Sequence, residues 1–498
     1  MNAPDDIDEL MTLVHAVKEE TFMKTVSAIR HSCPAIAFLL VWPLMLHSAV
    51  VNVSSVAALQ SAVNKAAMGD TIVLADGTYL NSTLAIGASN ITVRAATPGG
   101  VFLNGTNRID ITGSHVTFCG FQFTSGDIGE GQLIEVSGSH NLLTQLNVNG
   151  YQAKTYIVVE AGSQYNEISY CNIENKPESA ASGCTIQIHI SPTVVGYHKI
   201  RYCSFRNFPG PGGDFGNEPL RIGLSTEKEN VSRTIVEHCY FDNVGPGDSE
   251  SISIKSCENV CRYNTFTNNP KGMLVFRQGN GNSAYGNFFV NGSGGIRIKC
   301  GHNQCVYNNY FETRSANALM LMYVAENPIY NINVVHNTFV NMGEITLGGA
   351  GPAGVTFANN IFQKTSAPIF RDPNGGTTWV GNMYTGTLGI TVSSGMTNHD
   401  PLLKTNVDGY SGLTSSSPAI DASSSSYPAI MDIADIDDDP SLLLDIEGQP
   451  RPAAGTLKDV GCDEYVKGKT TNRPLTLSEA GPSYLGGPEG AGCPGRNR

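Results

Sequence analysis

The sequence predicts an all-β fold, a right-handed parallel β-helix, and three observations support that prediction. A short phrase, Asn-x-aromatic, recurs between Asn264 and Tyr384, and its aromatic residues follow one another at steps of 23, 22, 28, 23 and 22 residues. The segments between them alternate apolar and polar residues with the period of a β-strand. Charged residues make up only 15% of the chain, and its 54 glycines suit a protein rich in turns.

A repeat of roughly 22 to 25 residues without helical pattern indicates a solenoid coil made of three short strands. Such coils stack at about 4.8 Å, so equivalent residues are expected to form columns, with aromatic rings inside and asparagines at a bend. A leucine-rich repeat would need a leucine framework that this sequence lacks, and a propeller would need a longer period. The phrase occurs at Asn264-Thr265-Phe266, Asn287-Phe288-Phe289, Asn309-Tyr310-Phe311, Asn337-Thr338-Phe339, Asn360-Ile361-Phe362 and Asn382-Met383-Tyr384, and with Cys in place of Asn at Cys171, Cys203 and Cys239.

Residues 1–49 are expected to be an N-terminal extension and a signal peptide. Lys24 and Arg30 precede an apolar run over residues 35–46, and the small residues Ser48 and Ala49 follow it, as a signal-peptidase site requires. The run is short for a membrane span. A membrane anchor or a buried segment is the alternative. The sequence therefore predicts a secreted, extracellular protein that has no membrane attachment once the signal is removed.

Residues 50–465 are expected to form the β-helix domain. Residues 55–67 have the apolar spacing of an amphipathic helix, which would protect the exposed edges of the first coil. Residues 417–421 and 459–465 resemble closing segments at the other end. Residues 466–498 are rich in glycine and proline without periodicity, and they are predicted to be a disordered tail.

The cysteines leave the disulfide pattern open. The chain has 12 cysteines, and cleavage of a signal containing Cys33 would leave an odd number. Cys257 with Cys261, and Cys300 with Cys305, are near enough in sequence to close small loops. Cys171, Cys203 and Cys239 recur at equivalent repeat positions, which also fits stacked core thiols. Six Asn-x-Ser/Thr sequons would permit glycosylation of a eukaryotic protein, at Asn52, Asn81, Asn90, Asn104, Asn230 and Asn291.

The net charge of the chain is −13, which argues against nucleic acid as its main partner. A stripe of cations is nevertheless expected on one face of the helix. The apolar residues beside these positions alternate with the cations, so five cations should point outward: Arg221, Lys255, Arg277, Arg297 and Lys299. Lys255, Arg277 and Arg297 are separated by 22 and 20 residues, which predicts that they stack one coil apart. Such a stripe suits an extended anionic ligand, although single surface cations are usually only solvated.

Carboxylates lie close to this stripe. Asp248 and Glu250 directly precede the strand that leads to Lys255, and Asn217 lies about one coil earlier. Oxygen ligands from adjacent coils are what a Ca²⁺ site needs. Glu250 shares the parity of a buried residue, Ile252, so a bend must separate the two if Glu250 points outward. Asp-x-Glu by itself is most often a polar turn, and no His/Cys cluster has the spacing of a soft-metal site.

Segments of these central coils resemble polysaccharide lyase family six, which includes alginate lyases and the dermatan-cleaving chondroitinase B. The similarity covers roughly residues 55–465, and it is strongest in the motifs Asn217-Glu218-Pro219-Leu220-Arg221, Glu250-Ser251-Ile252-Ser253-Ile254-Lys255, Phe276-Arg277-Gln278-Gly279-Asn280, Gly295-Ile296-Arg297-Ile298 and Asn308-Asn309-Tyr310-Phe311-Glu312.

The resemblance implies a calcium-assisted β-elimination on a uronate polysaccharide, with alginate as the expected substrate. It assigns Lys255 as general base and Arg277 as general acid. It assigns the calcium ligands to Asn217, Asp248 and Glu250, although the position of Asn217 could also fall on Asp214 or Glu218. Arg221 and Arg297 are the expected substrate-binding residues. The family's usual His after the acid is Gln278 here, which bears on substrate preference.

Three alternatives remain open. The substrate could be dermatan sulfate or pectate instead of alginate, within the same chemistry. The protein could instead be a catalytically inert β-helix that binds glycans. A hydrolase using Asp248 and Glu250 as paired carboxylates is the third alternative, but such an enzyme would not need Lys255 and Arg277 beside that pair.

Overall fold

The computed structural model describes residues 48–177, 183–210, 217–245, 249–322, 329–348, 353–365, 367–431, 433, 436, 442–452, 456–466, 468–488 and 493. The chain divides into two units, residues 1–48 and 49–498, and almost all described residues belong to the second. The predicted signal peptide lies outside the described residues except for its last two positions, Ser48 and Ala49. None of the described helices is long and apolar enough to cross a membrane.

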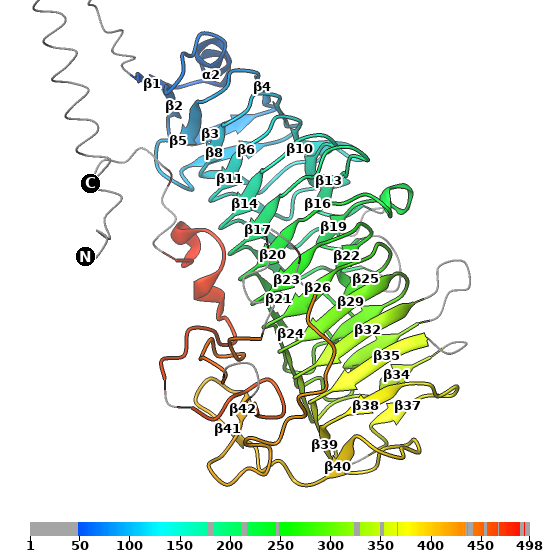
Figure 1. Ribbon diagram of the computed structural model, residues 1–498. Coiled ribbons are helices and arrows are strands. Elements are labelled where there is room, and N and C mark those ends of the chain that lie inside the picture. The colour runs from blue at the N-terminus through cyan, green and yellow to red at the C-terminus, as the bar shows by residue number, and fades with distance from the viewer. Residues whose placement is uncertain are drawn as a thin grey trace, which may run out of the picture. The chain divides into compact units, whose positions relative to one another are not determined.

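Three parallel sheets form the second unit, as the sequence predicts, and they wind as a β-solenoid (Figure 1). Neighbours within a sheet generally lie three strands apart in the chain, so each coil contributes one strand to every sheet. The first sheet contains β1 (Val50–Val53), β2 (Thr71–Leu74), β5 (Thr92–Ala95), β8 (Thr117–Cys119), β11 (Leu142–Thr144), β14 (Glu167–Ser169), β17 (Lys199–Arg201), β20 (Ile235–Glu237), β23 (Val260–Arg262), β26 (Ser283–Tyr285), β29 (His302–Tyr307), β32 (Tyr330–Val335), β35 (Ala353–Ala358) and β38 (Thr378–Val380).

The second sheet is the one that holds the predicted cation stripe. It contains β4 (Thr83–Ile86), β7 (Arg108–Ile111), β10 (Gln132–Val136), β13 (Thr155–Val159), β16 (Ile186–Ile188), β19 (Leu220–Ile222), β22 (Glu250–Ile254), β25 (Met273–Phe276), β28 (Ile296–Ile298), β31 (Leu319–Leu321), β34 (Ile345–Leu347) and β37 (Phe370–Arg371).

The third sheet continues to the last coil. It contains β3 (Gly77–Leu80), β6 (Val101–Asn104), β9 (Phe121–Phe123), β12 (Asn147–Asn149), β15 (Asn172–Glu174), β18 (Ser204–Arg206), β21 (Tyr240–Asp242), β24 (Thr265–Thr267), β27 (Phe288–Val290), β30 (Tyr310–Phe311), β33 (Thr338–Val340), β36 (Ile361–Gln363), β39 (Asn382–Thr385) and β40 (Met396–Asn398). A small antiparallel pair follows, β41 (Lys404–Thr405) with β42 (Ser411–Gly412).

The interior columns predicted from the repeat are present. A stack of phenylalanine rings runs through seven successive coils with centroid separations of 4.5–5.1 Å, at Phe205, Phe241, Phe266, Phe289, Phe311, Phe339 and Phe362. The asparagines form a hydrogen-bonded ladder: the amide of Asn264, for example, donates to Oδ1 of Asn287 at 3.0 Å. Because every asparagine satisfies the backbone of the coil before it, the ladder holds the bend in the same place from coil to coil.

Where cysteine replaces asparagine in the repeat, the core contains thiols. Cys171, Cys203 and Cys239 are all buried, and the Sγ of Cys203 donates to the carbonyl of Arg201 at 3.4 Å. The interpretation of these residues as stacked core thiols is therefore confirmed. Cys257 is also buried, and its Sγ donates to the carbonyl of Lys228 at 3.3 Å.

A helix, α2 (Val56–Val63), lies within residues 55–67, where the sequence predicts one. Ser55 begins it, because its hydroxyl accepts a hydrogen bond from the Ala58 amide. The helix packs against β2 and β4, and Leu59 and Val63 join the hydrophobic core of the solenoid.

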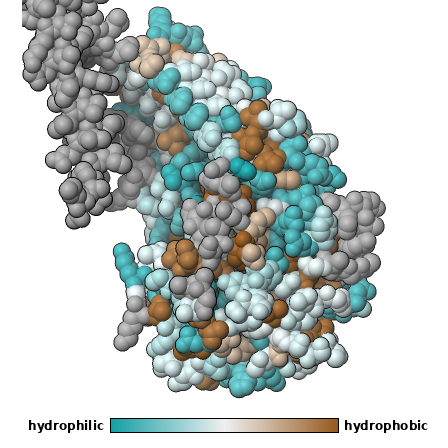
Figure 2. Space-filling model, viewed as in Figure 1, coloured by the Kyte–Doolittle hydropathy of each residue, from teal (hydrophilic) through white to brown (hydrophobic). Residues whose placement is uncertain are grey.

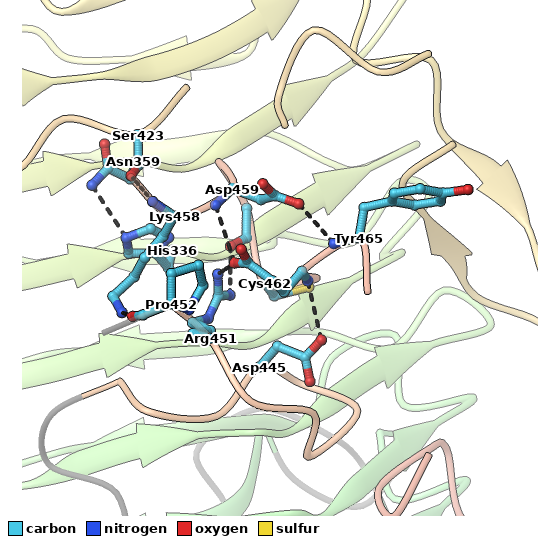
Figure 3. A network of polar contacts seen from close by, with 12 residues as sticks. His336, Asn359, Ser423, Asp445, Arg451, Pro452, Lys458, Asp459, Cys462 and Tyr465 are labelled. Atoms are coloured by element: carbon cyan, nitrogen blue, oxygen red, sulfur yellow. Dashed lines mark hydrogen bonds and ion pairs between the residues drawn. The ribbon is translucent and has the colours of Figure 1, made fainter. Parts of the chain in front are cut away.

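The segment after β42 folds back against the outer faces of two sheets. Ile433, Ile436 and Leu442 pack on the first sheet, whereas Ile446 and Cys462 pack on the third. The centre of this segment is Arg451 (Figure 3), whose side chain is fully buried. Arg451 donates to Glu464 at 2.9 Å, to Asn308 of the solenoid at 3.0 Å and to the Gly461 carbonyl at 2.9 Å. The carboxylate of Asp459 accepts from the Tyr465 amide at 2.7 Å. A buried guanidinium that is paired with a carboxylate and makes two further hydrogen bonds recovers part of its desolvation cost, so this network helps to hold residues 445–452 and 456–465 on the solenoid.

Residues 468–488 differ from the disordered tail that composition predicts. They lie beside the third sheet (Figure 1), where the Leu475 amide donates to Thr265 at 2.7 Å and the Ser483 amide donates to Gln145 at 2.8 Å. The segment includes two short 3₁₀ helices, η2 (Leu477–Glu479) and η3 (Ser483–Leu485). A disulfide joins Cys493 to Cys119 in β8. This segment needs no periodicity of its own, because the solenoid supplies its hydrogen-bond partners.

Candidate active site

Arg221 and Arg297 lie on the outer face of the second sheet, in β19 and β28, and Lys255 and Arg277 directly follow β22 and β25. Their apolar neighbours Ile252, Ile254, Leu274 and Phe276 are fully buried, which confirms the parity argument for Lys255 and its companions. Figure 2 shows that hydrophobic residues on the visible side of the protein form separate patches among hydrophilic ones.

The cations form two columns instead of the single stripe that the spacing predicts. The first column contains Arg221 and Arg297, which are separated by two uncharged residues. Arg221 is paired with Ser253, Ser253 with Val275, and Val275 with Arg297. The residue one coil beyond Arg277 is Lys299, since each follows directly after a paired residue, Phe276 and Ile298. The prediction that Arg297 stacks on Arg277 is wrong by two residues. It still lies on the same face, because a shift of two residues preserves strand parity.

A bulge in β22 turns Glu250 toward these cations. The register with β25 shifts between Glu250 and Ile252, so that an extra residue, Ser251, breaks the alternation. This is the bend that the sequence required. The Glu250 side chain is only 3% exposed, and its Oε1 accepts from Arg277 and, at 2.6 Å, from Arg297. One carboxylate therefore holds the predicted acid and a predicted substrate-binding residue in fixed positions.

Glu218 makes a second ion pair on the preceding coil. Its Oε1 accepts from Nε of Arg221 at 2.6 Å, and the side chain is 3% exposed. Its other oxygen, Oε2, is buried and has no hydrogen-bond partner in the described part of the chain. Asn217, next to it, is buried and donates weakly to the Pro209 carbonyl at 3.4 Å.

The predicted calcium ligands are brought together only in part. Asn217 and Glu250 lie on adjacent coils, whereas Asp248, like Asp214, lies outside the described residues. Within the described ranges, no group of three or more His, Cys, Asp or Glu side chains is arranged to hold a metal. The donors that are present are carboxylate and amide oxygens, and the orphaned Oε2 of Glu218 is an acceptor that a hard cation would satisfy. The donor atoms are thus of the kind that Ca²⁺ prefers, and Glu218 joins the candidate ligands.

Lys255 differs from the arginines around it. It is half-buried, and among the described residues no carboxylate pairs with its ammonium. Burial, and then the positive charge of Arg221, lower the pKa of Lys255 below its usual range, and Arg277 acts in the same direction. On the preceding coil, the position next to Lys255 is Gly223, which has no side chain. Gly223 has φ +83°, and a Cβ at this residue would lie 3.1 Å from the Lys255 carbonyl oxygen. The amine is thus a candidate base beside an open position.

One lysine near the site could not be found from the sequence. Lys176 is buried, and its ammonium donates to the carbonyls of Lys154, at 2.8 Å, and Gly183. Burial lowers the pKa of Lys176 to about 8. Lys176 belongs to no repeated phrase. The number of residues between β15 and β16 departs from the repeat, so the position of Lys176 in its coil could not be predicted from spacing. It anchors backbone beside Cys184, close to the Glu218–Arg221 pair.

Comparison with known proteins now identifies the family. The family model described as Chondroitinase B matches residues 53–374, more than half of the chain. The chain belongs to this family, and the resemblance to polysaccharide lyase family 6 (PL6) is confirmed. None of the curated proteins matches the sequence significantly.

Several solved structures are similar. The PL6 family alginate lyase AlyGC is 25% identical with a TM-score of 0.67, over 74% of this chain and 56% of AlyGC. A mannuronic acid specific family 6 lyase from human gut microbiota is 25% identical with a TM-score of 0.60, over 68% of this chain and 86% of the other. A PL6 alginate lyase in complex with a trisaccharide shares the fold, with 19% identity and a TM-score of 0.62, over 76% of this chain and 93% of the other. This chain thus spans only 56% of the length of AlyGC.

Proposed function

We propose that this protein is a polysaccharide lyase that cleaves a uronate-containing polysaccharide by β-elimination. The observation that carries the proposal is Lys255: an amine without an ion pair in the described structure, with a lowered pKa, one coil from Arg277 on the basic face of an acidic protein. A base of this kind and a cation beside it are what removal of a proton next to a carboxylate requires.

The reaction can be written with these two residues. The neutral Lys255 amine takes the proton on the carbon next to the uronate carboxylate. The electron pair forms a C=C bond as the glycosidic C–O bond on the neighbouring carbon breaks, and the departing oxygen takes a proton. Arg277 stabilises negative charge on that oxygen. Since a guanidinium rarely gives up a proton, water can supply it.

Ca²⁺ is part of the proposal. Asn217, Glu218 and Glu250, with Asp248, would hold it, and when bound it would stabilise the negative charge that proton removal adds to the uronate carboxylate. Glu250 also fixes Arg277 and Arg297, so it serves as ligand and as support. A carboxylate has about four lone-pair positions, which accommodates both roles.

Alginate is the proposed substrate, because the structures that share 25% identity with this chain are described as an alginate lyase and a mannuronic acid specific lyase. Dermatan sulfate remains the second candidate, since the matching family model is that of chondroitinase B. A glycan-binding β-helix without activity would have no use for an amine with a lowered pKa beside Arg277.

The proposal is tested by ultraviolet absorbance of the unsaturated uronate product. Mannuronate-rich alginate, guluronate-rich alginate, dermatan sulfate and polygalacturonate are incubated separately with the protein, with calcium and with chelator. An absorbance rise on one polymer that disappears in Lys255→Ala supports the lyase and identifies its substrate. If a folded, calcium-loaded sample produces no rise on any polymer, the lyase proposal fails.

We also propose that the protein is secreted, on the strength of the apolar run over residues 35–46 and the small residues after it. N-terminal sequencing of protein recovered from the medium tests this. A mature N-terminus near residue 50 is expected, and retention of the full chain inside the cell would contradict it. In a eukaryotic host, the exposed sequon residues Asn52, Asn81 and Asn90 are the positions to check for glycans.

A further inference from the structure

Lys299 occupies a position in the site that neither the spacing nor the family resemblance assigns. It follows β28 directly, so Lys255, Arg277 and Lys299 form one column on three successive coils. The coils are about 4.8 Å apart. That distance is close to the length of one sugar ring in an extended chain, so neighbouring sugars along the helix axis would each meet a different member of the column.

The charge of Lys299 has no balancing carboxylate in the part of the chain that the structure describes. Among the described residues no carboxylate pairs with it, whereas Glu250 is already shared by Arg277 and Arg297, and Glu218 is paired with Arg221. Three cations in adjacent coils repel one another. The repulsion is relieved when anionic groups bind between them, which is what a row of uronate carboxylates would do.

The two directions along this column differ in charge. Beyond Lys299 the next two positions are Met322 and Gly348, which are uncharged. In the other direction, beyond Gly223, the column contains His189, which is paired with Glu227, and then Glu160. A polyanion is therefore favoured on the side of Lys299 and opposed on the side of Glu160.

We propose that Lys299 is a substrate-binding residue that holds the carboxylate of the sugar carrying the departing oxygen, so that the uronate chain extends from Lys255 over Arg277 toward the C-terminal coils. This rests on the proposed lyase function. Lys255 contacts the sugar that loses its proton, and Arg277 contacts the glycosidic bond that breaks. Lys299, the next residue of the column, then contacts the sugar on the other side of that bond.

The test compares Lys299→Ala, the charge-preserving Lys299→Arg and the control Lys199→Ala, an exposed lysine on the first sheet. In Lys299→Ala we expect KM to rise about tenfold, the cost of one charge-assisted contact, with kcat within about twofold. Lys299→Arg and Lys199→Ala should stay close to wild type. The KM effect should persist with the shortest oligosaccharide that the wild type cleaves, because every productive complex fills the position beside Arg277. KM of Lys299→Ala should also depend less on salt.

Failure of this inference is distinguishable from failure of the proposed function. If the wild type cleaves a uronate polymer and Lys299→Ala has an unchanged KM, Lys299 does not bind substrate and the lyase stands. If the wild type cleaves nothing, calorimetric binding of a mannuronate hexasaccharide replaces KM. Weaker binding by Lys299→Ala then supports the contact, and equal binding refutes it.

Discussion

The electrostatic role of Arg221 can be tested through the pH dependence of the reaction. Lys255 acts as a base only when neutral, and the positive charge of Arg221 disfavours its ammonium form. Replacing Arg221 with Gln removes that charge and leaves the negative charge of Glu218 in place, so the pKa of Lys255 rises. On the ascending limb of the kcat profile, a smaller fraction of the enzyme then has a neutral Lys255 at any given pH. The ascending limb therefore moves to higher pH.

The size of the effect follows from the register. Arg221 is paired with Ser253, so it lies one coil and two residues from Lys255, about 8 Å between Cα atoms. Two unit charges at that distance interact by about 2 kcal/mol at an effective dielectric constant of about 20. Because Lys255 is only half-buried, solvent halves this to about 1 kcal/mol, about a fivefold change in its protonation equilibrium.

The assay is kcat at saturating substrate and calcium, measured by product absorbance across the pH range. Arg221→Gln should reduce kcat about fivefold on the ascending limb and leave the plateau at high pH unchanged. Arg108→Gln is the matched control, since Arg108 is an exposed residue on the same sheet, five coils from β22 and therefore beyond the screening length. A limb that stays in place, or moves to lower pH, would refute the assignment of Lys255 as the base tuned by Arg221.

Four further predictions follow from the same structure. Lys255→Arg keeps the positive charge but supplies no neutral amine, so activity should be lost while circular dichroism is unchanged; measurable turnover would exclude Lys255 as the base. Calcium should raise the thermal midpoint of the wild type relative to chelator, and Glu218→Gln should reduce that difference; an equal calcium shift in the variant would remove Glu218 from the ligand set. Cys493→Ser opens the disulfide to Cys119, which spans 374 residues, and should lower the free energy of unfolding in urea by about 3–5 kcal/mol; no change would show that the C-terminal segment is held without it. Phe289→Ala leaves a gap in the ring stack and should cost about 3–5 kcal/mol by the same measurement, and a cost below about 1 kcal/mol would mean that the neighbouring rings collapse into the gap.

Strand parity accounts for most of the site that could be predicted. Alternation alone placed Lys255 and Arg277 outside and Ile254 and Phe276 inside, because a side chain in a strand has only two faces to choose from. The relative position of Arg297 could not be obtained in the same way. Coils differ in length at their bends, so the number of residues between two cations does not give their register.

Glu250 shows the same limit more sharply. Its parity with Ile252 argues for burial in the core, and only the bulge at Ser251 turns it toward Arg277. A bulge depends on the pairing of two strands and has no reliable signature within one of them. The sequence leaves Glu218 as an alternative calcium ligand, but its ion pair with Arg221 and the unpartnered state of its second oxygen depend on how the folded coils pack.

Three features can be predicted from the sequence: the fold class, the interior columns of phenylalanine and asparagine, and the face on which the candidate base and acid lie. These follow from local periodicity, which every coil repeats. Three others require the folded chain: which cations share a column, which carboxylate pairs with them, and where the described C-terminal residues lie. Each of these depends on contacts between distant segments: Lys299 joins Arg277 through sheet register, and Arg451 and Ser483 find partners on the solenoid that no local pattern specifies.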